Sequence, residues 1–143
     1  KSLAGRELPF TPSVMSYKTL IASDSLLNTP PCWCIYMLGL VLDWLETQGG
    51  LAGMEQIKRE RAARVYAYLD ESRLFKAHAR ADSRSDMNVT FRTGDPALDA
   101  EFINLKGHKV AGGMRASLYN AMPMEGVTAL IDYMKEFETK HHV

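Results

Sequence analysis

Residues 106–137, KGHKVAGGMRASLYNAMPMEGVTALIDYMKEF, join a glycine-rich segment to an expected strand and an expected helix. The strand is expected over residues 114–119, directly after Gly112 and Gly113. Pro123 has no amide N–H and therefore suits the first turn of the following helix. Apolar residues recur beyond it at the helical period, namely Met124, Val127, Leu130, Ile131, Met134 and Phe137. The stretch predicts a strand followed by an amphipathic helix.

Two further elements are expected upstream of this stretch. Residues 87–91 alternate apolar and polar side chains as a half-buried strand does, and Gly94-Asp95-Pro96 turns out of it into a short helix. A long helix is expected over residues 51–72, after a glycine pair. Its inner face would hold Met54, Ile57, Val65 and Leu69, and its outer, solvated face Lys58, Arg59, Glu60, Arg61 and Arg64.

Another helix is expected from Pro30-Pro31 to about Gln48, and its composition is unusual. Apolar side chains cover nearly its whole circumference, so it is either central in its domain or docks on another chain or another part of the protein. Residues 1–31 hold four prolines and no sustained period, which predicts an extended connector. Helices with a few strands and no regular βαβ alternation predict a two-layer α+β domain.

Composition excludes several classes of function. A chain of 143 residues with 46% hydrophobic residues fits one domain. Seventeen basic and seventeen acidic residues leave no net charge, so no general attraction to nucleic acid or to a membrane surface is expected. The longest apolar run, residues 32–45, is too short to span a bilayer. Cys32 and Cys34 are expected to be reduced core residues of a cytoplasmic protein, since no secretion signal is evident.

The glycine-rich segment is the first candidate site. His108, Lys109 and Arg115 flank glycines that let the backbone approach a ligand, as a phosphate or carboxylate pocket requires. Gly113 and Met114 stand where a P-loop needs lysine and serine or threonine, which disfavours nucleotide binding. A glycine turn with solvated charges remains the alternative.

A second candidate lies ahead of the apolar helix. Asn28 and Thr29 could bind an anion at the helix start or could simply cap the helix. Other chemistry finds less support. The four histidines, His78, His108, His141 and His142, lack metal-ligand spacing, so no metal site is expected. Ser72, Ser83 and Ser85 lack a nucleophile context.

Both candidate segments carry a resemblance to the phosphoserine aminotransferases. Residues 25–31, SLLNTPP, resemble the family's segment before the first small-domain helix, and residues 85–89, SDMNV, resemble its central strand. The most specific similarity lies in KGH at 106–108, GGMRAS at 112–117 and YNAMP at 119–123. Residues 39–41, 44–45, 49–50 and 126–127 extend the resemblance over nearly the whole chain.

The resemblance implies a fold type I, class V aminotransferase that uses pyridoxal 5'-phosphate and works as a homodimer. Its reaction moves an amino group between glutamate and 3-phosphohydroxypyruvate, releasing or consuming phosphoserine in serine biosynthesis, with pyridoxine biosynthesis as a further option. By resemblance, Asn28 and Thr29 reach the cofactor phosphate of the neighbouring subunit. His108 and Lys109 hold the substrate's phosphate or distal carboxylate across the dimer, and Arg115 takes the α-carboxylate.

The chain departs from the family pattern in two places. Lys109 stands where the family usually has arginine, and the stretch from Phe102 to Lys106 is shorter than in similar sequences. The family's Schiff-base lysine belongs to a large domain upstream, and neither Lys1 nor Lys18 has its context, so no catalytic residue is expected here. Residues 1–27 are then expected to be an inter-domain connector, and residues 28–143 the C-terminal small domain.

Two alternatives remain at this stage. The chain could be a non-catalytic interaction module whose apolar helix binds a partner. It could also belong to another fold type I aminotransferase, one acting on alanine or serine with glyoxylate or pyruvate. The basic residues His108 and Lys109 favour a phosphorylated substrate over that last option.

Overall fold

The computed structural model describes residues 2–109 and 112–141. Lys1, His142 and the middle of the glycine-rich segment, Val110 and Ala111, lie outside the described residues, as does Val143. The chain divides into two compact units, Lys1–Trp44 and Leu45–Val143, and each is described by itself. The domain boundary expected between residues 27 and 28 stays a prediction.

The first unit contains short helices within the segment expected to be extended. A 3-10 turn, η1, covers Ser13–Met15, and helix α1 covers Tyr17–Ala22. Ser16 caps α1, because its Oγ accepts a hydrogen bond from the amide of Thr19. Glu7 accepts hydrogen bonds from the Lys18 amide and the Ser16 hydroxyl, which lower the pKa of its carboxyl group. The expectation of an extended connector is therefore wrong for residues 13–22. These helices are too short to show a repeating apolar pattern in the sequence.

Helix α2, Cys32–Thr47, confirms the expected start after the proline pair. None of its residues is buried, and Trp33 is 71% exposed. Its exposed apolar side chains are Trp33, Ile35, Tyr36, Met37, Leu38, Leu40, Val41, Leu42 and Trp44. Cys32 and Cys34 are exposed as well, so their assignment to a core is wrong. The sequence left open whether this helix is central in its domain or docks on another chain or another part of the protein. Because none of its residues is buried, a central position is excluded.

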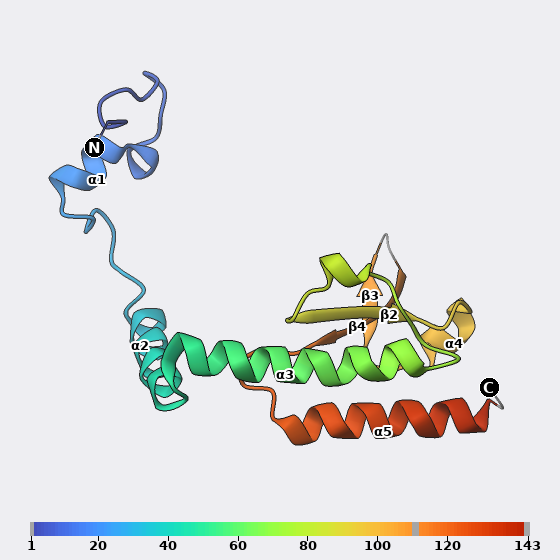
Figure 1. Cartoon of the computed structure of the whole chain (residues 1–143). Coiled ribbons are helices and arrows are strands. Elements are labelled where there is room, and N and C mark those ends of the chain that lie inside the picture. Colours follow the sequence, from blue (N-terminus) through green and yellow to red (C-terminus); the bar gives the residue numbers. More distant parts are fainter. Residues whose placement is uncertain (1, 110–111, 142–143) are drawn as a thin grey trace. The chain divides into compact units, whose positions relative to one another are not determined.

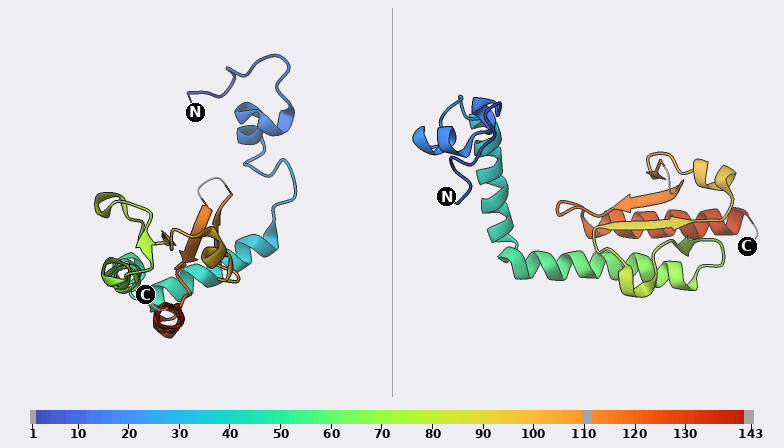
Figure 2. Two further views of the ribbon diagram at one scale, coloured as in Figure 1. Left: turned by 90° about the vertical axis from the view of Figure 1, so that its right-hand side faces the viewer. Right: turned by 90° about the horizontal axis from the view of Figure 1, so that it is seen from above.

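The second unit is a two-layer α+β domain, as expected. Its sheet has the order β1-β2-β4-β3 and is antiparallel throughout, with β1 at Lys76–Ala77, β2 at Asn88–Arg92, β3 at Lys106–His108 and β4 at Gly112–Ser117. Helices α3, Gly50–Glu71, and α5, Met124–Lys140, run side by side in the same direction (Figure 1). Both lie on the same side of the strands, as the end-on view shows (Figure 2, left).

The core lies between this helix pair and one face of the sheet. Phe75 is fully buried and contacts the rings of Phe91, Phe102 and Phe137 with centroid separations of 5.4–6.0 Å. Side chains from β2 and β4 join it at every second position, because strand residues alternate between the two faces. The remaining core members are Ala62, Val65, Tyr66, Tyr68, Leu69, Leu74, Val89, Met114, Ala116, Leu118, Val127 and Met134.

Polar contacts fix the chain where it leaves α3 and where it enters β2. Glu138 of α5 accepts hydrogen bonds from the Tyr68 hydroxyl, the Ser72 hydroxyl and the Leu74 amide. Arg84 pairs with Asp70 through two hydrogen bonds and lies over the Tyr66 ring at 4.5 Å. These contacts join α5 to the end of α3 and join α3 to the segment before β2.

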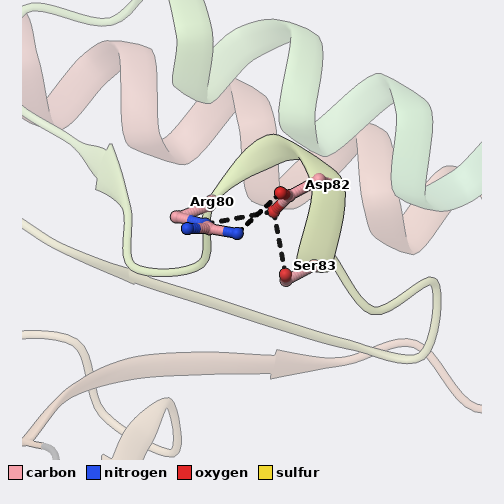
Figure 3. Close-up of polar contacts among 3 residues, drawn as sticks. All are labelled: Arg80, Asp82 and Ser83. Carbon is pink, nitrogen blue, oxygen red and sulfur yellow. Dashed lines mark hydrogen bonds and ion pairs between the residues drawn. The ribbon is translucent and has the colours of Figure 1, made fainter.

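The connection between β1 and β2 contains a second 3-10 turn, η2, at Ala81–Ser83. Asp82 accepts two hydrogen bonds from the Arg80 guanidinium, at 2.7 and 3.2 Å, and one from the Ser83 hydroxyl, at 2.8 Å (Figure 3). The Ser83 and Arg80 hydrogen bonds lower the pKa of the Asp82 carboxyl group. Ser83 therefore has a local structural partner in this turn.

Candidate functional site

The sheet face opposite the helices carries the candidate site. Arg115 of β4 is exposed on this face and lies directly opposite Thr90 of β2, while the flanking residues Met114 and Ala116 point into the core. A hollow of about 230 Å³ opens here. It is lined by His78, Asn88, Thr90, Phe91, Arg92, His108, Gly112, Gly113, Met114 and Arg115.

The glycines of the segment are required by backbone geometry. Gly112 and Gly113 adopt φ values of +67° and +65°, which side chains disfavour. A Cβ at Gly107 would lie 2.2 Å from the carbonyl oxygen of Gly112, so only glycine lets β3 pair this closely with β4. His108 lies at the end of β3, opposite Gly112.

Lys109 lies beside a second, more open hollow of about 830 Å³. This second hollow shares Arg92, His108, Gly112 and Gly113 with the first, and adds Lys106 and Lys109 among its lining residues. The structure thus brings His108 and Arg115 to one hollow, and His108 and Lys109 to its neighbour. Their roles in binding substrate stay predictions.

Asn28 and Thr29 belong to the first unit. Both are exposed in the segment before α2, where the Cys32 amide donates to the Pro30 carbonyl at 2.8 Å. Within the described part of the chain, no hydrogen bond from either side chain is found, so their amide and hydroxyl groups do not cap α2. Such short polar donors suit a phosphate group. Their role towards a cofactor stays a prediction.

One buried residue was assigned wrongly from the sequence. Arg61 of α3, expected on the solvated face, is 6% exposed, and its Nη1 donates to the carbonyls of Tyr119 and Asn120 at 3.2 and 3.1 Å. It therefore ties α3 to the chain that follows β4. Arg61 lies seven residues after Met54 and four before Val65, which is the spacing of the buried face, so the helical period could have revealed it.

The sequence reasoning also missed two residues of the site, Arg92 and His78. Arg92 follows Thr90 by two positions, so the alternation of β2 places it on the same face as Arg115. His78 follows β1, and its amide donates to the Thr90 carbonyl at 2.9 Å. Among residues 2–109 and 112–141, no cluster of three or more metal-ligating side chains is found.

Comparison with known proteins decides the family. The family model described as "Aminotransferase class-V" matches residues 2–130. The chain belongs to the class-V aminotransferases. This finding confirms the family to which the motifs at residues 25–31 and 106–123 pointed.

Similar class-V aminotransferases are named phosphoserine aminotransferase. The relative from Bordetella pertussis is 46% identical over 150 residues, which cover 99% of this chain and 40% of the relative. That from Desulfosudis oleivorans is 52% identical over 137 residues, covering 89% and 38%. The solved phosphoserine aminotransferase of Bacillus circulans subsp. alkalophilus is 40% identical, with a TM-score of 0.86 over 92% of this chain and 39% of that one.

The class-V aminotransferase chain spans about two-fifths of the length of these relatives. The alignment with the Bordetella protein extends over 150 residues, more than the 143 of the chain, so that relative has additional residues within the matched span. The shortening expected between Phe102 and Lys106 is one place that could account for them. The likeness to this solved structure confirms the α+β fold.

Proposed function

We propose that the chain is the small domain of a phosphoserine aminotransferase, which transfers an amino group between glutamate and 3-phosphohydroxypyruvate in serine biosynthesis. The observation that supports this most is the hollow on the open sheet face, where Arg115 and His108 meet. A guanidinium suits bidentate binding of a carboxylate, and a neighbouring cation suits a second anionic group. The similarity to enzymes of that name supports the same assignment.

In this proposal, three residues of the chain bind the substrate. Arg115 holds the α-carboxylate that glutamate and phosphoserine have in common. His108 and Lys109 hold the group at the other end of the substrate, where glutamate has a carboxylate and phosphoserine a phosphate. Since Lys109 is a point charge and not a planar fork of donors, it tolerates either group.

Pyridoxal 5'-phosphate is the cofactor in this proposal. A solved relative from Trichomonas vaginalis, 38% identical with a TM-score of 0.80, is described as bound to PLP. The amide and hydroxyl groups of Asn28 and Thr29, for which residues 2–109 and 112–141 provide no hydrogen-bond partner, fit the cofactor's phosphate chemically. When bound, the cofactor supplies the electron sink that amino-group transfer requires. The chain's own residues bind and orient its phosphate and the substrate.

We further propose a homodimer and a cytoplasmic location. The exposed apolar surface of α2 supports subunit contact, because soluble proteins seldom expose so much apolar area. No helix in the described part of the chain combines the length and hydrophobicity that crossing a bilayer requires. The balance of acidic and basic residues supports small-molecule substrates over a nucleic-acid partner.

Arg115→Lys in the full-length protein tests the proposal. A bidentate charged contact is worth about 1.5–3 kcal/mol, so kcat/KM should fall roughly ten- to a hundredfold for glutamate and phosphoserine alike. Lys109→Ala should instead change the ratio between the two substrates, because it reads the group that differs. Arg59→Lys, on the outer face of α3, is the matched control. Unchanged kinetics in Arg115→Lys would show that Arg115 does not bind the α-carboxylate.

A further inference from the structure

Arg92 lies on the open sheet face, between the two hollows. It lines both hollows, whereas Arg115 lines only the smaller one and Lys109 only the larger. Because Thr90 lies opposite Arg115, Arg92 is a diagonal neighbour of Arg115 across β2 and β4, at a Cα separation of about 7–8 Å. A small substrate with an anionic group at each end can reach both side chains.

The local charges leave the Arg92 guanidinium without a partner among the described residues. Lys76 lies directly opposite it on β1, and like charges at such positions are destabilising. The Lys76 ammonium donates a hydrogen bond to the Ser72 carbonyl. Asp99, a carboxylate of the larger hollow, is engaged by the amide and hydroxyl of Thr93 at 2.8 and 2.7 Å. A bound anion would supply the partner that Arg92 lacks among the described residues.

The backbone beside Arg92 keeps this space open. Gly113 has no side chain, and a Cβ there would lie 3.3 Å from the Cβ of Arg92 and 2.8 Å from the carbonyl oxygen of Phe91. Any larger residue would press on the base of the Arg92 side chain. The glycine therefore leaves the floor of the smaller hollow free between Arg92 and Arg115.

We propose that Arg92 is a further substrate-binding residue, which contacts the phosphate of the substrate whose α-carboxylate is held by Arg115. This inference rests on the proposed function for the identity of the substrate. Its physical basis is the neighbourhood of Arg115, His108 and an unpaired guanidinium. A phosphate carries up to two charges and accepts hydrogen bonds from several donors at once, so it suits a guanidinium with a second donor group beside it.

The test uses the full 143-residue chain labelled with ¹⁵N and titrated separately with inorganic phosphate, O-phosphoserine and L-serine. Phosphate and phosphoserine should shift the Gly113 amide and the Arg92 Nε signal saturably. Arg92→Gln should weaken phosphate binding by about fivefold or more, since the loss of one charged contact is worth at least that factor. It should leave the serine-induced shifts, which report the α-carboxylate, unchanged. Arg59→Gln, an exposed arginine paired with Glu55, is the matched control and should change neither.

The outcomes separate this inference from the proposed function. Equal phosphate affinity in Arg92→Gln and the unchanged chain, or equal losses for phosphate and serine, would overturn the role of Arg92. Absence of any saturable phosphate shift at Gly113 would overturn it as well. The transamination reaction is measured independently, so it can stand when the Arg92 assignment fails. Unchanged core resonances show that Arg92→Gln is folded, as its exposed position implies.

Discussion

Replacing Glu138 should weaken the second unit far more than replacing its neighbour Glu136. The Glu138 carboxylate accepts hydrogen bonds from the Tyr68 hydroxyl at 2.8 Å, the Leu74 amide at 2.9 Å and the Ser72 hydroxyl. All three donors belong to residues that are at most 9% exposed. Glu138→Ala leaves them without an acceptor, and each unsatisfied buried donor costs about 1–3 kcal/mol.

The expected loss in the free energy of unfolding is about 3 kcal/mol, because water reaches part of the site and the costs do not add fully. Urea denaturation followed by hydrogen exchange of the α3 and α5 amides measures it within the second unit. Glu136→Ala removes only an exposed ion pair with Lys140 and should change little. The reasoning is refuted if the two substitutions have equal effects.

The same carboxylate predicts a pH dependence of stability. Burial alone would raise the pKa of Glu138, but the hydrogen bonds from Ser72, Leu74 and Tyr68 outweigh it, and the pKa is lowered. A carboxyl group with a folded pKa below its unfolded pKa stabilises the fold above the unfolded pKa, near 4.3. That contribution is lost as the pH falls from the unfolded pKa through the lowered folded pKa. Glu138→Gln should remove this part of the pH dependence.

Further predictions concern other parts of the chain. Arg61→Ala should destabilise the second unit by about 2 kcal/mol, since it removes two hydrogen bonds and a buried stem, and Arg64→Ala on the outer face is the control in the same urea experiment. The isolated chain should self-associate through α2, and sedimentation showing a monomer at high concentration would contradict this. The isolated chain should also show no aminotransferase activity and no visible cofactor absorbance; a visible band abolished by borohydride would contradict the assignment as a small domain.

The helices of the second unit could be predicted from the sequence, because their signals are local. Pro123 directly precedes the last helix, and apolar residues such as Val127, Met134 and Phe137 recur at the helical period. The strands β1 and β3 could not be predicted, because they contain only two and three residues. Such short strands exist through pairing with β2 and β4, which a local pattern does not contain.

Long-range contacts also explain where the residue predictions failed. Arg61 is buried because the carbonyls of Tyr119 and Asn120, nearly sixty residues away, accept hydrogen bonds from its guanidinium. A charged residue is normally predicted at the surface, and Arg61 can be buried only because its guanidinium is hydrogen-bonded. Cys32 was assigned to a core on the basis of an apolar neighbourhood, whereas the structure leaves that helix exposed. Apolar composition indicates that a surface becomes covered, and does not say by what.

The candidate site was predicted in part, for a related reason. His108, Lys109 and Arg115 stood out because cations flank glycines within one short segment. Arg92 is more than fifteen residues away in sequence and joins them only through the register of β2 with β4. The strand expected over residues 87–91 stops one residue short of Arg92, and its neighbour across the sheet becomes known only from the pairing.

The central claim is that this domain serves an aminotransferase for a phosphorylated substrate. It is tested most directly by comparing acceptors in the full-length protein, with glutamate as the amino donor and 3-phosphohydroxypyruvate or pyruvate as the acceptor. The cations around His108 and Arg92 predict a kcat/KM at least roughly a hundredfold higher for 3-phosphohydroxypyruvate, because a site built for a charged group rejects an analogue that lacks it. Equal values, or a preference for pyruvate, would contradict the claim.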